Sequence, residues 1–190
     1  GLLQKVSVLV VGPGLGQASW GRSLLSAAAN APLAQVWDAD ALNMLAGELV
    51  TLPKDCVITP HPGEAARLLG MSTAQVQADR PAAAHALSKK YTAVVILKGA
   101  GSLIASPDGR LSVCHQGHPA MATAGLGDVL AGLVGALLAQ GMDAFDAACL
   151  GVWLHANAGA QQGKSGRGLA ASDLIPAIRQ LLEEQAPCLK

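Results

Sequence analysis

Apolar residues in this chain occur in short continuous runs that alternate with longer segments in which they recur periodically. The continuous runs are rich in Val and Ile and end at Gly, Pro or Asp, as is typical of strands buried on both faces. Strands are therefore predicted over residues 6–11, 34–40, 56–59 and 92–99.

The periodic segments repeat apolar residues three and four positions apart, which predicts helices with one buried face. Pro62 is placed as expected for the first turn of a helix. Between 102–106 and 111–115, the Asp108-Gly109 pair predicts the turn of a β-hairpin. The other helices are predicted over residues 17–29, 41–49, 73–90, 125–140, 143–162 and 172–185.

Strands that alternate with helices predict an α/β fold, a three-layer sandwich in which helices cover both faces of a mostly parallel sheet. No internal repeat or linker divides the chain, so residues 1–190 are expected to form a single domain. Ligands bind such sheets beyond the carboxyl ends of the strands. The polar residues that follow the predicted strands are therefore the first candidates for a site.

Composition narrows the class of protein further. Hydrophobic residues make up 51% of the chain and charged residues 14%, which indicates a globular protein. Thirteen basic residues balance thirteen acidic ones and aromatics make up only 3%, so a nucleic-acid partner is not expected. No uncharged apolar run reaches the ~18 residues of a membrane span. Reduced thiols in a cytoplasmic protein are expected, because no two of the cysteines are close in sequence: Cys56, Cys114, Cys149 and Cys188.

Two candidate segments follow the first two predicted strands. The Gly-rich turn VGPGLGQ (residues 11–17) indicates either a close backbone approach to a ligand phosphate or ribose, or merely a tight turn. Asp38 and Asp40 are two positions apart and can point the same way. Their oxygens suit a hydrated magnesium ion, but Asp40 is better explained as the N-cap of a helix starting at Ala41. Asp38 stays open between the two interpretations.

The third candidate segment follows the strand that ends at residue 59. His61 lies between two prolines, where a stiff backbone is expected to hold its ring out of the following helix, and this favours a ligand contact over a structural hydrogen bond. Glu64 lies in the first turn of that helix. There a carboxylate either stabilises the helix dipole or positions a metal ion through water.

The fourth candidate segment opens the apolar helix that starts near Gly125. Backbone N–H groups at its glycines are able to bind an anion, and Asp128 beside them is placed to accept a proton from an attacking hydroxyl. Asp128 is also explained as a dipole partner of the helix, although glycine on both sides of Leu126 favours the functional interpretation. The segment KGAGS (98–102) suits contacts to a nucleotide phosphate, or alternatively a tight turn with a solvated lysine.

The motifs together are more specific than any one of them. In chain order they are GPGLG, DADALN, TPHPGEAARLLG, LKGAGS, GHPAMATAGLGDVLAG and ASDL. This series resembles, over essentially the whole chain, the ADP-dependent NAD(P)H-hydrate dehydratase family of the ribokinase-like superfamily. The resemblance implies a repair reaction in which ADP, with Mg²⁺, phosphorylates the hydroxyl of hydrated NADH or NADPH (NADHX or NADPHX). Phosphate then leaves, so that NAD(P)H is restored and AMP is released.

The resemblance also implies a wider organisation. The family domain is often the C-terminal part of a bifunctional protein with an upstream epimerase domain, and its members tend to form homo-oligomers. The strands and helices that usually precede GPGLG are not in this chain, so an N-terminal part of the domain is expected to be missing.

Residue roles follow from the resemblance motif by motif. Asp128 matches the catalytic aspartate beside the substrate hydroxyl, and Gly14 and His61 match further substrate-contacting positions. Glu64 matches a glutamate that organises magnesium through water in related kinases. The nucleotide-binding positions are matched by Gly127 and by Lys98, Gly99, Ala100, Gly101 and Ser102.

The sequence departs from the family pattern at Ser102, where threonine is common, and in the segment before Asp128. His118-Pro119-Ala120 replaces the usual Asn-x-Gly, and Ala124 replaces a usual glycine. Two other functions stay open: a ribokinase-like kinase of a small alcohol such as a vitamin precursor or sugar, and a nucleotide-binding module without catalysis.

Overall fold

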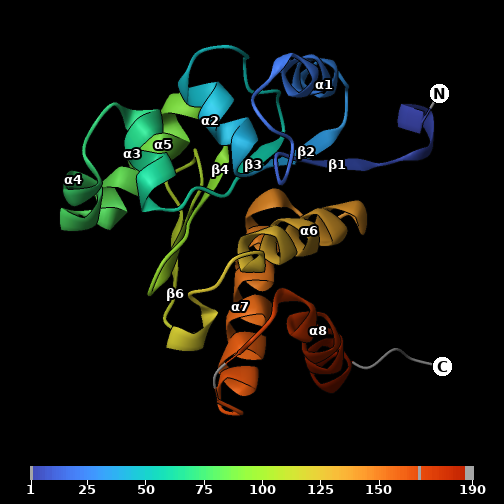
Figure 1. Ribbon diagram of the computed structural model, residues 1–190, viewed down its shortest axis with the longest axis vertical. Coiled ribbons are helices and arrows are strands. Elements are labelled where there is room, and N and C mark those ends of the chain that lie inside the picture. The colour runs from blue at the N-terminus through green and yellow to red at the C-terminus, as the bar shows by residue number, and fades with distance from the viewer. Residues whose placement is uncertain (1, 167, 187–190) are drawn as a thin grey trace.

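A six-stranded sheet, in which the strands follow one another in chain order, forms the middle of the molecule (Figure 1). The computed structural model describes residues 2–166 and 168–186. Strands β1 to β4 run parallel, whereas β5 and β6 are antiparallel to their neighbours. The parallel strands therefore end at one edge of the sheet. The strands are β1 (Val8–Val11), β2 (Ala34–Trp37), β3 (Cys56–Ile58), β4 (Val94–Leu97), β5 (Ser102–Ala105) and β6 (Leu111–Cys114).

Helices cover both faces of this sheet. The helices are α1 (Ser19–Ala29), α2 (Asp40–Ala46), α3 (Pro62–Leu69), α4 (Thr73–Ala78), α5 (Arg80–Tyr91), α6 (Leu126–Ala139), α7 (Ala144–Gly163) and α8 (Ala171–Gln185), with 3₁₀ turns η1 (Leu2–Lys5) and η2 (Pro119–Met121). Helices α1 to α5 share a core with one face, α6 and α7 with the other, and α8 packs against α6 and α7 (Figure 1). The predicted three-layer α/β sandwich is confirmed.

The chain order of the strands explains the division of the helices. Crossovers between parallel strands are nearly always right-handed, so strands added in one direction place their connecting helices on one face. The other face is left for helices α6 and α7. Strand β4 is buried between the two layers: Val95 and Leu97 pack toward α1–α5, and Val94 and Ile96 toward α6 and α7. This is why its apolar run shows no alternation.

The prediction of one helix over residues 73–90 is wrong. The structure has two helices, α4 and α5, separated at Asp79, whose backbone is non-helical (φ −145°, ψ 81°). Pro81 has no N–H to donate, and in a continuous helix its ring would clash with the carbonyl of Gln77. The carboxylate of Asp79 instead accepts a hydrogen bond from Ala82 N and caps the new helix.

The other predicted helices and strands are present, and their ends shift by a few residues. The strand predicted over 34–40 ends at Trp37, and the helix predicted over 41–49 begins at Asp40 and ends at Ala46. Among the described residues, no helix combines the length and the apolar character needed to cross a membrane.

Three of the four cysteines lie in the described part of the chain as free thiols, namely Cys56, Cys114 and Cys149, whereas Cys188 lies outside it. Burial raises the pKa of the Cys56 thiol and, to a smaller degree, that of Cys149. Both thiols are therefore kept in the protonated, unreactive form.

Candidate active site

A cavity of about 780 Å³ opens beside the carboxyl ends of β3 and β4. All five residues of the predicted nucleotide-binding segment 98–102 line it, together with His61, Gly127 and residues 115–119. Gly14 and Asp128 are not among its lining residues. The structure thus brings the predicted nucleotide-binding residues to one cavity and leaves two of the predicted substrate-binding residues outside its wall.

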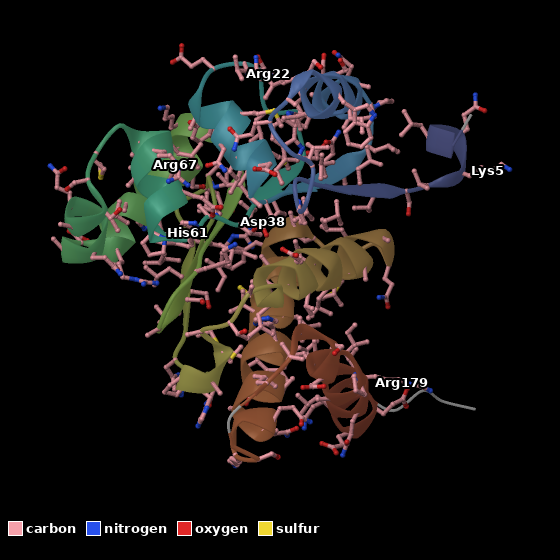
Figure 2. The ribbon with its side chains drawn as sticks, viewed as in Figure 1. Lys5, Arg22, Asp38, His61, Arg67 and Arg179 are labelled. Atoms are coloured by element: carbon pink, nitrogen blue, oxygen red, sulfur yellow. The ribbon has the colours of Figure 1, made fainter. Side chains whose placement is uncertain are left out.

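An ion pair between Lys98, which lines the cavity, and the buried Asp38 lies at the cavity wall. Lys98 Nζ is 2.7 Å from Asp38 Oδ1 and 4.0 Å from Glu64 Oε2. The Asp38 residue is only 1% exposed, and Figure 2 shows it near the middle of the molecule, where the sheet, α2 and α6 meet. Removing one member of such a pair leaves an uncompensated buried charge. Because the ammonium group of Lys98 is paired with this buried carboxylate, the alternative of a solvated Lys98 is excluded.

Asp40 binds a different part of the chain. Its carboxylate accepts hydrogen bonds from Gly16 N (2.8 Å) and Gln17 Nε2 (3.1 Å). The prediction that Asp40 is the N-cap of α2 is wrong, because the helix begins at Asp40 itself, after Ala39 at φ 47°. Asp38 and Asp40 consequently do not form a pair of carboxylates around one site.

The Gly-rich turn after β1 makes its close approach to the protein itself. A Cβ on Gly12 would lie 1.7 Å from the carbonyl oxygen of Asp38, and its φ of +127° also requires glycine. Gly14 is exposed, and a Cβ built there meets no atom within 4 Å. The role of Gly12 is therefore to let the turn pack on β2, and the substrate contact of Gly14 stays a prediction.

The N-terminus of α3 satisfies its own hydrogen-bonding groups. His61 Nδ1 accepts hydrogen bonds from Gly63 N (3.0 Å) and Glu64 N (3.4 Å), and Glu64 Oε2 accepts one from His61 N (2.8 Å). This is a capping box with histidine in the place usually taken by Ser or Thr. The prediction that the ring is held away from the helix is wrong, although His61 still lines the cavity.

Glu64 is buried, at 5% exposure, and the cap explains its place in the first turn. Its predicted magnesium role is not excluded by the cap, because that role acts through water. In the part of the chain that the structure describes, no three His, Cys, Asp or Glu side chains are grouped to hold a metal ion directly.

The N-terminus of α6, in contrast, has no side-chain cap. Its N-cap is Gly125, in the left-handed conformation (φ +84°), and no side chain caps it. Within the described residues no hydrogen bond engages the N–H groups of Leu126, Gly127 or Asp128. Asp128 is exposed and has no hydrogen bond or ion pair with any described residue. These donors and this carboxylate are available to a ligand.

Gly127 connects this helix end to the buried ion pair. A Cβ on Gly127 would lie 3.2 Å from Lys98 Nζ and 3.6 Å from Asp38 Oδ2. The missing side chain therefore allows α6 to approach the ammonium group closely. Gly127 in α6, Lys98 after β4 and Asp38 after β2 come from three separate segments and meet only in the folded protein.

Two residues at the site were missed by sequence reasoning. His155 of α7 lines the cavity, and its Nε2 lies 2.8 Å from the carbonyl oxygen of Leu126. Since a carbonyl only accepts, His155 Nε2 carries the proton. Arg80 Nη2 donates to the carbonyls of Leu97 and Gly101, on either side of the cavity loop. A lone histidine in an apolar helix was a weak signal for the first, and no local signal marked the second.

Comparison with known proteins identifies the family to which the chain belongs. A family model described as NAD(P)H-hydrate dehydratase matches residues 1–180. The chain belongs to the NAD(P)H-hydrate dehydratase family. It is 45% identical over 183 residues to a bifunctional NAD(P)H-hydrate repair enzyme of Coxiella burnetii, which covers 95% of this chain and 37% of the relative. It is also 45% identical over 190 residues to the ADP-dependent (S)-NAD(P)H-hydrate dehydratase of Neisseria meningitidis, which covers 94% of this chain and 64% of the relative. The chain thus spans less than two thirds of the length of either relative.

Solved structures agree with the family assignment. An ADP/ATP-dependent NAD(P)H-hydrate dehydratase of Bacillus subtilis, co-crystallised with ATP and Mg²⁺, superposes with a TM-score of 0.82 at 28% identity, over 94% of this chain and 66% of that one. A ribokinase-like superfamily protein of Enterococcus faecalis superposes with a TM-score of 0.87 at 24% identity, over 98% of this chain and 66% of that one. The second likeness shows that the fold is ribokinase-like, as predicted.

Proposed function

We propose that this protein catalyses the ADP-dependent dehydration of hydrated NADH or NADPH, with release of AMP and phosphate. The observation that carries the proposal is the bare N-terminus of α6, where free N–H groups and the exposed Asp128 adjoin a cavity lined by residues 98–102. Membership of the NAD(P)H-hydrate dehydratase family and the ADP dependence of the Neisseria relative support the choice of reaction and donor.

The proposed first step is transfer of a phosphoryl group to the hydroxyl of the damaged nicotinamide ring. The hydroxyl oxygen attacks the β-phosphorus of ADP, the bond from that phosphorus to the bridging oxygen breaks, and AMP leaves. Asp128 accepts the hydroxyl proton as general base. The N–H groups of Leu126 and Gly127 stabilise the negative charge of the phosphoryl group in transfer.

The proposed second step is elimination. The carbon–oxygen bond to the new phosphate breaks, a proton leaves the neighbouring ring carbon, and the ring double bond is restored. Phosphate is a much better leaving group than hydroxide, which is why the hydroxyl is phosphorylated first. Gly14 and His61 are proposed to contact the substrate, and Lys98 with residues 99–102 to contact the nucleotide.

Magnesium is the proposed cofactor. Mg²⁺ retains several waters and needs only one or two carboxylates besides the substrate phosphates, and Glu64 beside the cavity fits that water-mediated mode. Direct coordination fits less well, because Glu64 Oε2 already accepts the His61 N–H. Bound magnesium would neutralise phosphate charge during the transfer.

The wider organisation is proposed on the same basis. The Coxiella relative is bifunctional, which supports an epimerase domain joined upstream of a dehydratase domain of this kind. A cytoplasmic location and a homo-oligomeric state complete the proposal. Light scattering tests the oligomeric state.

One assay tests the reaction. The protein is incubated with ADP, Mg²⁺ and hydrated NADH, and the absorbance of reduced nicotinamide is followed together with AMP and phosphate. We expect NADH, AMP and phosphate to form in equal amounts. A phosphorylated product that accumulates without NADH would instead indicate a kinase, and ADP binding without any turnover would indicate a silent nucleotide-binding module.

A further inference from the structure

The side chain of Arg80 binds the cavity loop 98–101 on the side that faces away from the cavity. A single nitrogen of its guanidinium, Nη2, donates to Leu97 O at 3.2 Å and to Gly101 O at 2.9 Å. Leu97 is the last residue of β4, and Gly101 directly precedes β5. Arg80 therefore joins the two ends of the loop that connects these strands. Arg80 is not among the residues that line the cavity.

The hydrogen bonds from Arg80 determine on which side of the loop its carbonyl groups and its N–H groups lie. The carbonyls of Leu97 and Gly101 accept from Arg80, and that of Gly99 accepts from Ser102 Oγ at 3.2 Å. In contrast, no hydrogen bond from the N–H of Gly99 or Ala100 occurs within the described residues, and both residues line the cavity. Free N–H groups of successive residues in a glycine-rich turn form a concavity that suits anions.

Gly99 is shaped to fit the guanidinium. A Cβ on Gly99 would lie 2.3 Å from Arg80 Nη1, and the residue has φ +148°, so a side chain there would displace the guanidinium and strain the backbone. The first glycine of KGAGS thus serves the contact with Arg80, and the loop and the arginine form one unit. The guanidinium stays charged when partly buried, even though desolvation lowers the pKa of Arg80.

The break between α4 and α5 places the arginine at this position. Asp79 ends one helix and caps the next, so Arg80 becomes the first residue of α5. A continuous helix over 73–90 would have carried the same side chain in its middle, with a different axis. The helix break is therefore linked to the form of the nucleotide loop.

We propose that Arg80 is a positioning residue for the nucleotide phosphates, acting through the loop 98–101, whose Gly99 and Ala100 N–H groups it directs into the cavity. The proposal rests on the proposed function, since it takes ADP as the ligand of this cavity. It assigns to Arg80 an effect on nucleotide affinity without contact between its side chain and either substrate.

Steady-state kinetics and calorimetry of the protein with ADP and Mg²⁺ test this role. Loss of charged hydrogen bonds to the loop is expected to raise the KM and the Kd for ADP about 10- to 100-fold in Arg80→Ala. The KM for hydrated NADH is expected to stay within about twofold, because the loop does not contact the nicotinamide. Arg179, an exposed arginine of α8 without a partner among the described residues, gives the matched control Arg179→Ala (Figure 2).

Two further variants separate positioning from general stability. Arg80→Lys keeps the charge and is expected to fall between the wild type and Arg80→Ala, and added methylguanidinium is expected to restore ADP affinity to Arg80→Ala. Gly99→Ala displaces the guanidinium, so Arg80→Ala combined with Gly99→Ala is expected to weaken ADP binding less than the two single effects added. If Arg80→Ala does not fold, Arg80→Lys and Gly99→Ala carry the test.

The outcomes are distinct. A wild-type protein that does not bind ADP overturns the proposed function itself. A wild-type protein that binds ADP, with Arg80 variants that bind it equally well and melt at a lower temperature, reduces Arg80 to a support of the α4–α5 junction and overturns the inference alone. An equal rise in the KM of both substrates also overturns it.

Discussion

The N-termini of α3 and α6 have the same arrangement of residue types, but the first is capped by side chains and the second is not. Each helix has glycine at its second position and a carboxylate at its third, in the sequences HPGE and GLGD. In α3 the N-cap His61 accepts two backbone N–H groups, and Glu64 folds back to a third. In α6 the N-cap Gly125 has no side chain, and Asp128 is exposed without a partner among the described residues.

The difference shows that the N-cap residue decides whether a helix end is available to a ligand. A helix end whose donors are satisfied by its own side chains has fewer left for an anion, whereas uncapped N–H groups carry the full positive end of the helix dipole. The aspartate of α6 is also one methylene shorter than the glutamate of α3 and reaches its own N-cap less easily. This difference favours the proposal that the chemistry takes place at α6, while α3 forms a rigid wall of the site.

The largest expected effect comes from the carboxylate of α6. Asp128→Asn keeps the shape of the side chain but removes the base, so kcat is expected to fall by about 10²- to 10⁴-fold, while ADP binding is unchanged. Glu64→Gln is the matched change in α3 and keeps the capping box, because glutamine also accepts the His61 N–H. Near-normal turnover in Asp128→Asn, with intact folding by circular dichroism, would remove the assignment of the base.

The glycines at the second helical positions give the next contrast. In Gly127→Ala the new Cβ, 3.2 Å from Lys98 Nζ, pushes the ammonium away, and kcat/KM is expected to fall about 10- to 100-fold. In Gly63→Ala the Cβ lies 2.9 Å from His61 Cε1 and disturbs the cap. There the free energy of unfolding is expected to fall by at most about 1 kcal/mol, since alanine favours the helix. Equal losses of kcat/KM in the two variants would contradict the contrast.

The cap of α3 is expected to contribute to stability. Glu64→Ala removes the acceptor of the His61 N–H and the charge at the helix N-terminus, so the free energy of unfolding is expected to fall by about 1–2 kcal/mol. Urea denaturation measures this change in stability, and Glu64→Gln is expected to lose less than half as much.

In Glu64→Gln the Mg²⁺ concentration for half-maximal activity is expected to rise several-fold if Glu64 orients the ion through water. An unchanged Mg²⁺ dependence would leave Glu64 with the cap alone.

The smallest expected effect is a pH dependence that comes from His155, which binds the first carbonyl of α6. Burial lowers the pKa of His155 below the ordinary imidazole value, the Lys98 charge lowers it further, and the hydrogen bond to Leu126 opposes both. The unfolded chain therefore takes up its proton at a higher pH than the folded protein does. The contribution of neutral His155 to stability is present above the ordinary value of about 6.5 and is lost as the pH falls below it toward the lowered pKa.

Denaturation at a series of pH values checks this sign. Between about pH 7.5 and about pH 5.5, the free energy of unfolding is expected to fall more in the wild type than in His155→Gln, which does not titrate. Parallel curves for the two proteins would show that His155 does not titrate differently in the folded and unfolded states.

Much of the fold was predictable from the sequence because burial on both faces leaves a local signature. The continuous apolar run of β4, for example, follows directly from its place between two helical layers. The break at Asp79 was missed because apolar periodicity continues through Pro81, and only the steric cost of proline separates α4 from α5. Asp40 was misassigned for a similar reason, since capping and a contact with a distant turn look alike from residue type.

The candidate site was predictable only in part. The motif order identified the family and placed Lys98 and Gly127 among the nucleotide contacts, and the structure brings both to one cavity. The partner of Lys98, Asp38, is 60 residues away in the chain, and Arg80 is 21 residues from Gly101. No local pattern reports such pairs.

The sequence by itself determined most of the elements, the layered architecture and the residue types available for the proposed phosphoryl transfer, because these depend on hydrophobic periodicity and on motifs of a few neighbouring residues. The tertiary structure decided which of two similar helix ends stays uncapped, which carboxylate pairs with Lys98, and which arginine binds the loop 98–101. These outcomes depend on distances between segments far apart in the chain. These distances are fixed only in the folded protein, where the carboxyl ends of the parallel strands lie at one edge of the sheet.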